Sequence, residues 1–132
     1  MADGFPTPQD AEDAFYDAFE AHDLTAMMAV WGETDDLVCI LPMGPVVQGR
    51  GAIAGVWKQV FSHADRPHIV VHHRQWVESP DLAAHVVEEQ ISFPATAGTP
   101  PAMIATNVYR RHAGGWRMVL HQASPPPPPL RG

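Results

Sequence analysis

Three polar side chains in the second half of the chain are the first candidates for chemistry. Glu89, Asn107 and His121 lie in three segments of alternating pattern, and all three occupy odd-numbered positions. Alternate residues of a strand face the same side of a sheet. In an apolar pocket the pKa of Glu89 would rise, so that it could exchange protons near neutral pH. His121 titrates in the same range, and Asn107 could donate a hydrogen bond to a carbonyl or developing oxyanion.

The alternation alone leaves the direction of these side chains open, because both faces of the predicted strands carry apolar residues. In the alternative arrangement Glu89 lies on the sheet surface, with Glu88 inward or both carboxylates at a wet rim. His121 could equally be a buried ring that hydrogen-bonds to backbone groups, and Asn107 fits either arrangement.

The chain has eight histidines, so a metal site has to be considered. His72 and His73 are adjacent on a predicted strand and therefore point to opposite faces. The sequence contains no His-x-His or Cys-x-x-Cys pair, and a metal site normally needs three or four convergent ligands. Only His85, His121 and Glu89 could converge as two imidazoles and one carboxylate. We expect neither a metal site nor a cofactor.

Length and composition exclude several classes of protein. A chain of 132 residues with 45% hydrophobic residues can form one domain with its own core. The net charge of −7 and the absence of a basic stripe argue against nucleic-acid binding. No apolar run reaches the roughly 20 residues that span a membrane. The single Cys39 lies in the apolar run 37–41 and is expected to be a core thiol. A soluble, cytoplasmic protein is the default expectation.

The segments around these candidates predict helices first and strands afterwards. Thr7 and Pro8 favour the start of a first helix, and Asp23 favours the start of a second that ends at Gly32. The predicted order is then strand 37–41, a turn at 42–45, strand 46–48, a third helix spanning 53–61, and antiparallel strands at about 68–78, 82–93, 102–112 and 116–123.

Five prolines, 125–129, follow the last predicted strand. They cannot extend the sheet and favour an extended polyproline conformation. We expect a domain over 1–124 and a disordered tail over 125–132. The alternative is that the prolines bind a proline-recognising partner.

This layout resembles the SnoaL-like and ketosteroid-isomerase-like proteins of the nuclear transport factor 2-like superfamily. The matching segments are 26–31, 42–50, 106–111 and 115–118. The resemblance implies an α+β fold, a cone-shaped barrel in which three N-terminal helices pack on a curved, mostly antiparallel sheet. It also implies that the odd-numbered set faces the pocket, and that the outer face forms a homodimer. Trp76 and Trp116 have the opposite parity, so the dimer face is their expected location.

The groups of the steroid isomerases can be compared residue by residue. The resemblance implies a general-base aspartate at the position of Leu41 and an oxyanion-hole acid at that of Asn107. It places the oxyanion-hole tyrosine near Phe15, with Tyr16 one residue away. Because Leu41 cannot accept a proton, we do not expect the parent isomerisation.

Taken together, these features predict a protein that binds a compact, partly aromatic or polycyclic molecule in an apolar cone. If it is catalytic, it would be a cofactor-free isomerase, dehydratase or cyclase in which Glu89, Asn107 and His121 converge between the third helix and the sheet. The expected ligand-binding residues are Phe15, Phe19, Trp31, Leu41, Trp57, Val87, Ile91, Ala105, Tyr109 and Val119. The alternative is a non-catalytic dimeric binding module.

Overall fold

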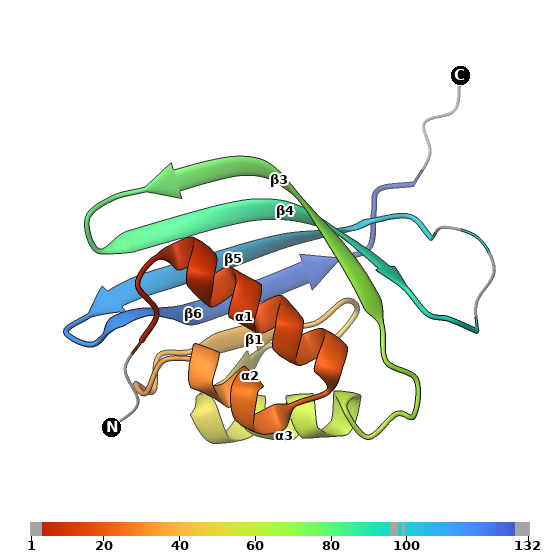
Figure 1. Cartoon of the computed structure of the whole chain (residues 1–132), viewed down its shortest axis with the longest axis horizontal. Helices are drawn as coiled ribbons and strands as arrows, with labels where there is room; N and C mark the ends of the chain where they lie inside the picture. The colour runs from red at the N-terminus through yellow and green to blue at the C-terminus, as the bar shows by residue number, and fades with distance from the viewer. Residues whose placement is uncertain (1–3, 96–97, 99, 129–132) are drawn as a thin grey trace.

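A computed structural model describes residues 4–95, 98 and 100–128 of the chain. Three helices lie against one face of a six-stranded sheet (Figure 1). The elements are α1 (Pro8–Ala21), α2 (Leu24–Val30), β1 (Val38–Ile40), β2 (Val47–Gln48), α3 (Arg50–Val60), β3 (His68–Glu78), β4 (Leu82–Ser92), β5 (Met103–His112) and β6 (Gly115–Ser124). The α+β class and the order of the elements are therefore confirmed.

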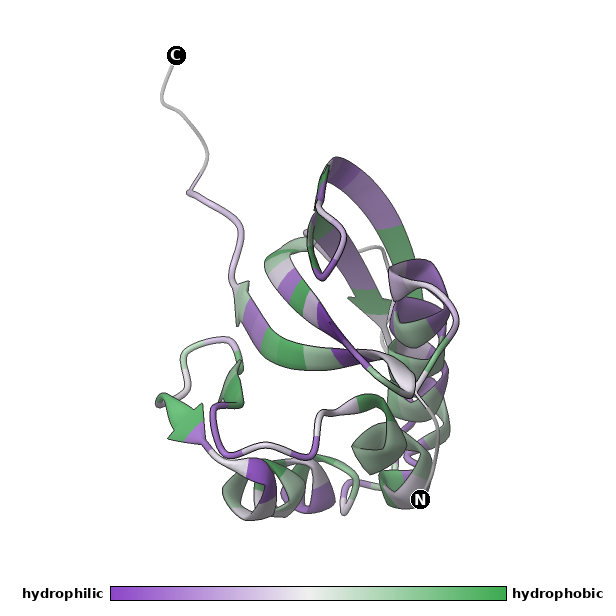
Figure 2. Cartoon of the chain, turned by 90° about the vertical axis from the view of Figure 1, so that its left-hand side faces the viewer, coloured by the Kyte–Doolittle hydropathy of each residue, from purple (hydrophilic) through white to green (hydrophobic). Residues whose placement is uncertain are grey.

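The sheet has the strand order β2-β1-β6-β5-β4-β3. All neighbours are antiparallel except β1 and β6, which are parallel. The long strands bend toward the helices, so the sheet is strongly curved (Figure 2). It is an open sheet, with β2 and β3 as its edges. The curvature brings β3 to β6 around α1, and this helix supplies Glu12 and Tyr16 to the polar network described below.

Local sequence signals fix the helix ends. The Thr7 side chain accepts a hydrogen bond from the Asp10 backbone N–H at 3.0 Å, and Pro8 takes the first helical position of α1. His22 ends α1 in the left-handed conformation, with φ of 53°. Asp23 then caps α2 by accepting from the Ala26 N–H at 3.0 Å. The short connection turns α2 back against α1.

Arg50, at the start of α3, holds the end of α2 in place. Its guanidinium donates to the carbonyl of Met28 at 2.7 Å and to those of Trp31 and Gly32 at 3.1 and 2.9 Å. Carbonyls at a helix C-terminus have no partner within the helix, so an arginine that reaches three of them joins two elements at once.

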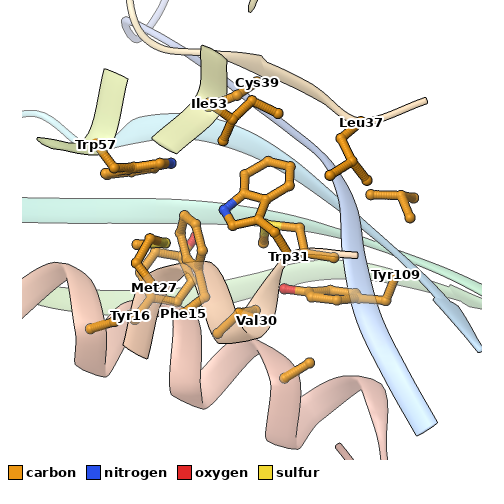
Figure 3. Packing of buried hydrophobic residues seen from close by; sticks show 14 of the residues in the cluster. Phe15, Tyr16, Met27, Val30, Trp31, Leu37, Cys39, Ile53, Trp57 and Tyr109 are labelled. Carbon is orange, nitrogen blue, oxygen red and sulfur yellow. The ribbon is translucent and has the colours of Figure 1, made fainter. Parts of the chain in front are cut away.

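Aromatic side chains fill the space between the helices and the sheet (Figure 3). Phe15, Trp31, Trp57 and Tyr109 are all completely buried. Phe15 packs edge-on against Trp57, with ring centroids 5.5 Å apart. Side chains of the described residues thus occupy the centre of the expected cone.

Two β-bulges change the direction of residues that simple alternation would turn outward. One lies between His73 and Gln75, so His73 and Trp76 both face inward although their numbers differ in parity. Trp76 stacks on the buried His85 ring, with centroids 4.0 Å apart. The expectation of Trp76 on the outer face is therefore wrong.

The second bulge lies at Val119, which has no partner on β5. It pairs Met118 with Tyr109 and leaves Leu120 opposite Val108. Met118 is fully buried and Trp116 is 8% exposed, so Trp116 also belongs to the core and not to the outer face. The outer face of the sheet is consequently less apolar than strict alternation predicts.

Residues 125–128 belong to no helix or strand, and the rest of the predicted tail, 129–132, lies outside the described residues. Within the described part of the chain, no helix has the length and apolar character needed to cross a membrane.

Candidate functional site

A buried network of polar side chains lies between α1 and the inner face of β3 to β6. It contains Glu12, Tyr16, His73, His85, Glu89, Asn107, Tyr109 and His121. Glu12, His85, Glu89, Asn107 and His121 each have at most 1% of their surface exposed. Burying so many charged and polar groups is costly unless they hydrogen-bond to one another, and here His85 Nε2 still has no hydrogen-bond partner. The network is therefore the first candidate for a functional site.

One half of the network is built around Glu89. The Tyr16 hydroxyl donates to Glu89 Oε2 at 2.6 Å and accepts from Asn107 Nδ2 at 3.0 Å. His121 Nδ1 lies 2.6 Å from Asn107 Oδ1. Because the amide oxygen can only accept, Nδ1 carries the proton of the imidazole. The chain of donors therefore runs from His121 through Asn107 and Tyr16 to the carboxylate.

Burial changes the acidity of these groups in opposite directions. It raises the pKa of Glu89 to about 7; the Tyr16 hydrogen bond works against this rise, and the charge of Glu12 adds to it. Burial lowers the pKa of His121 to about 4, so its ring is neutral at physiological pH. It raises the pKa of Tyr16 well above its usual range, and Tyr16 remains a hydrogen-bond donor. Glu89 can thus take up or release a proton near pH 7.

The other half is built around Glu12, which also projects from α1. Its Oε2 lies 2.9 Å from His85 Nδ1 and accepts from Tyr109 at 3.1 Å and from Asn107 at 3.2 Å. Its Oε1 contacts His73 Nε2. Burial alone would raise the pKa of Glu12, but the contacts with His85, His73 and Asn107 outweigh it and the pKa is lowered. Asn107 joins the two halves because its amide group donates to both Tyr16 and Glu12.

The three residues expected to carry chemistry do converge inside the fold. Asn107 and His121 are direct partners across β5 and β6, and Glu89 is linked to them through Tyr16. Their polar partners come from α1 rather than from the third helix, which contributes the Trp57 ring near His121. The expectation that they would converge against the third helix is therefore corrected. The tyrosine that the family comparison expected near Phe15 is present in the network as Tyr16.

The expected ligand-binding residues occupy two kinds of position. Phe19 and Leu41 line surface pockets described below. The residues Phe15, Trp31, Trp57, Val87, Ala105 and Tyr109 are fully packed in the interior, Ile91 is partly buried against the same core, and Val119 lies in the bulge. Phe15 and Trp57 cover the His121 ring, with centroids 4.8 and 6.3 Å away.

Two pockets open beside this aromatic layer. One, of about 370 Å³, is lined by Phe19, His22, Val60, His63, Ala64, Asp65, Pro67 and Phe93. The other, of about 350 Å³, is lined by Cys39, Leu41, Gly44, Pro45, Val47, Val56, Gln59, Val60 and His63. Val60 and His63 belong to both linings, so the pockets share a wall. Within the described residues, neither lining includes Glu89, Asn107 or His121.

The second pocket approaches the network through Cys39. This residue is the direct partner of His121 across the parallel strands β1 and β6. Burial raises the pKa of the Cys39 thiol to about 12, and the charge of Glu89 adds to the rise. Cys39 is therefore close enough to Glu89 to sense its charge while its own surroundings line the pocket.

Sequence reasoning missed Glu12 and His73 as members of the site, and it considered Tyr16 only as a neighbour of the expected tyrosine position and His85 only as a possible metal ligand. Glu12 and Tyr16 are four residues apart and so share a helix face, next to the apolar stripe that contains Phe15. A carboxylate and a phenol next to the apolar face of a helix could have indicated that α1 contributes polar groups to a buried site. Figure 2 shows the mixed hydropathy along α1. The inward direction of Trp76 depends on the bulge, for which the sequence offers no comparable sign.

Comparisons with known proteins agree with this architecture. A family described as a SnoaL-like domain matches residues 9–128. None of the curated proteins matches the chain. A solved structure from Thiobacillus denitrificans, provisionally named a calcium/calmodulin-dependent protein kinase type II association domain, is 44% identical, with a TM-score of 0.91 over 96% of this chain and 100% of that one.

Two more distant structures extend the comparison. A protein of the NTF2-like family from Streptomyces avermitilis, provisionally named a dehydratase, has a TM-score of 0.81 and 24% identity. A ketosteroid isomerase-like protein from Erwinia carotovora atroseptica has a TM-score of 0.70 and 26% identity. In both cases 91% of this chain and 94% of the other are covered. These two similarities concern the fold, and the names belong to those proteins.

Proposed function

The chain belongs to the SnoaL-like domain family, and we propose that it is a small-molecule enzyme that transfers protons with its own side chains. The reaction class is a cofactor-free isomerisation, dehydration or cyclisation. The observation that carries this proposal is the buried Glu89, whose pKa of about 7 lies where a proton-transfer group is most effective. A purely structural carboxylate gains nothing from such burial, because an apolar residue would fill the same space without the cost of desolvation.

In this proposal Glu89 removes a proton from the substrate and returns it at another atom. Tyr16 donates to Glu89, and its neutral hydroxyl can instead donate to a substrate carbonyl as negative charge develops there. Asn107 holds the Tyr16 oxygen in position at 3.0 Å. His121 acts as a positioning residue, because its ring N–H fixes the orientation of the Asn107 amide.

The substrate would approach from the pocket that Cys39 lines. That pocket has a volume of about 350 Å³, a size that suits a molecule of two or three fused rings, and its lining is mainly apolar. The packed rings of Phe15 and Trp57 lie against the His121 ring, and we propose that they move apart to admit the substrate. The proposed ligand is therefore compact and apolar, with one carbonyl or hydroxyl group that replaces a hydrogen bond of the network.

The test uses β-tetralone, a bicyclic ketone with acidic protons next to its carbonyl. In heavy water, proton NMR follows the exchange of these protons for deuterium with and without the protein. We expect the wild-type protein to accelerate the exchange and Glu89→Gln to lose at least about a hundredfold of that acceleration. Glu88→Gln is the matched control, because Glu88 is the adjacent residue on the other face of β4 and pairs with Arg74 at 3.3 Å.

Acceleration that survives Glu89→Gln would contradict the assignment of the base. Exchange at the buffer rate with wild-type protein would contradict the proposed reaction class for ketones of this size. Intrinsic fluorescence of the four tryptophans, which include the buried Trp57, separates a failure to bind from a failure to react.

A second candidate function is an assembly module, and the 44% identity to a structure named an association domain favours it. The outer face of the sheet offers a row of half-buried apolar residues, with Ala84, Val108 and Leu120 directly opposite one another on three strands. We propose that copies of the chain pair through this face as a homodimer. Light scattering of the wild-type protein and of Val108→Glu tests this: a mass near 14.4 kDa for the wild type would contradict it.

A further inference from the structure

We propose that Glu12, His73 and His85 form a binding site for one divalent transition-metal ion of the zinc type. This inference goes beyond the proposed proton transfer, which uses Glu89 and needs no metal. It rests on side chains from three elements, α1, β3 and β4, that meet at one point inside the edge of the sheet.

The ligand atoms are already gathered. One ligand atom from each of the three residues lies within 4.8 Å of the other two. Glu12 Oε2 is 2.9 Å from His85 Nδ1, and Glu12 Oε1 contacts His73 Nε2. Two ligands bound to the same zinc ion at roughly 2.1 Å each are roughly 3.0–3.4 Å apart. An ion could therefore enter between the carboxylate and the two rings after small side-chain movements.

The donor set selects the kind of ion. Two imidazole nitrogens and one carboxylate suit zinc, iron(II) and similar ions, whereas calcium and magnesium prefer oxygen ligands. Three protein ligands also leave at least one coordination position for water or a small ligand.

The surroundings orient the carboxylate and leave a route for the ion. Tyr109 and Asn107 donate to Glu12 Oε2 at 3.1 and 3.2 Å, and such outer hydrogen bonds are typical of metal-binding carboxylates. Trp76 stacks on His85 and fixes the plane of its ring. The His73 side chain is 32% exposed, so it connects the buried pair to solvent.

His73 faces inward in the regular register of β3, and the β3 bulge adds Trp76 to the same face, opposite His85. Without the bulge, His73 and Trp76 could not both face His85, since residues three apart on a regular strand point to opposite sides. The adjacent His72 points away from this cluster and is exposed. It therefore provides a matched control with the same residue type at the next position.

The experiment titrates the full-length protein, freed of metal with a chelator, with Co²⁺ and follows the visible absorption of the bound ion. Competition with Zn²⁺ then gives the zinc affinity. We expect one strongly absorbing Co²⁺ per chain, displaced by Zn²⁺. His73→Ala should weaken binding at least about tenfold, while His72→Ala leaves it within about twofold.

His73 is partly exposed, so its replacement should leave the fold intact, and circular dichroism checks this. Glu12→Gln provides a second variant, because glutamine keeps the shape of the side chain but loses the anionic ligand; we expect it to weaken binding similarly. The proposal is overturned if the wild-type protein shows no saturable binding of one ion per chain. It is equally overturned if His73→Ala binds as tightly as the wild type, or if His72→Ala weakens binding as much as His73→Ala.

Discussion

The Tyr16 hydroxyl on α1 donates a 2.6 Å hydrogen bond to Glu89 Oε2 on β4, across 73 positions of sequence. Both residues are buried, with exposures of 7% and 1%. Because the pKa of Glu89 is raised, its carboxyl group can take up and release a proton near neutral pH. Tyr16 stays protonated and acts as a neutral hydrogen-bond donor. This pair is the part of the network in which proton transfer to a ligand would begin.

Tyr16→Phe should raise the pKa of Glu89 above its wild-type value of about 7. The Tyr16 hydrogen bond favours the charged carboxylate and so lowers the pKa of Glu89. Without this bond, the effect of burial, which raises the pKa, is less compensated. The variant should also lose about 1–3 kcal/mol of stability, because the remaining partners are left short of one bond. Carbon NMR titration of the glutamate carboxyl groups measures the first effect and urea unfolding the second.

Tyr109→Phe is the control for that prediction. Tyr109 donates to Glu12 and not to Glu89, so its removal should leave the titration of Glu89 unchanged. A Glu89 pKa that stays the same or falls in Tyr16→Phe would show that the 2.6 Å contact does not stabilise the charged form.

The pH dependence of stability should separate Glu89 from His121. The pKa of Glu89 rises from 4.5 to about 7 on folding, so the folded state holds the extra proton between these values and stability falls as pH rises through that window. The pKa of His121 falls from 6.5 to about 4, so the unfolded state holds the extra proton there and stability rises with pH. The two contributions, each on the order of 3 kcal/mol, oppose each other.

Because the two contributions oppose each other in the wild type, single variants should show the dependence of stability on pH that each residue causes. In Glu89→Gln the melting temperature should rise from pH 4.5 to 6.5 more steeply than in the wild type. In His121→Asn, which keeps a donor near the Nδ1 position, it should fall between pH 4.5 and 7. Calorimetry across this range checks both signs, and the same slope in both variants would contradict the assignments.

Arg50→Met should destabilise the fold by about 2–4 kcal/mol. The guanidinium donates to three carbonyls near the end of α2, and methionine supplies none of these bonds. Arg50→Lys should recover only part of the loss, because one ammonium group cannot reach all three oxygens in the same geometry. Urea unfolding measures the stability of both variants. Full recovery of stability by lysine would be inconsistent with a guanidinium that binds three carbonyls at once.

The Cys39 thiol should react with dithiodipyridine at least about a hundredfold more slowly in the folded protein than in urea. It is completely buried, and its pKa of about 12 leaves almost no thiolate at neutral pH. Absorbance kinetics at pH 7 give the two rates. Reaction at the unfolded rate would mean that the pocket beside Cys39 opens to the thiol without hindrance.

The fold was accessible from sequence because strong local signals agreed with one another. Thr7 and Asp23 cap the first two helices as expected, and the strand limits of β3 to β6 differ from the predicted ones by at most one residue. Regular alternation also placed Asn107 and His121 side by side, because both strands are regular at that register.

The remainder of the site depends on features that alternation does not encode. The bulge at residues 73–75 turns Trp76 inward, and the bulge at Val119 does the same for Trp116 and Met118. A single extra residue shifts the alternation on one side of a bulge relative to the other, so an unseen bulge gives the wrong face for all residues of the strand on one side of it. Glu12 was missed for a different reason, since only tertiary packing shows that α1 buries a charged side as well as its apolar stripe.

The most direct test of the account is the pKa of Glu89 in the folded wild-type protein. Carbon NMR of protein labelled at the glutamate side-chain carboxyl carbons follows each group from pH 4 to 9, and Glu89→Gln identifies the resonance by its disappearance. We expect a midpoint near 7, set mainly by burial. A midpoint below 5 would show a carboxylate that is charged at neutral pH, and the proposed role of Glu89 as the proton-transfer group would be contradicted.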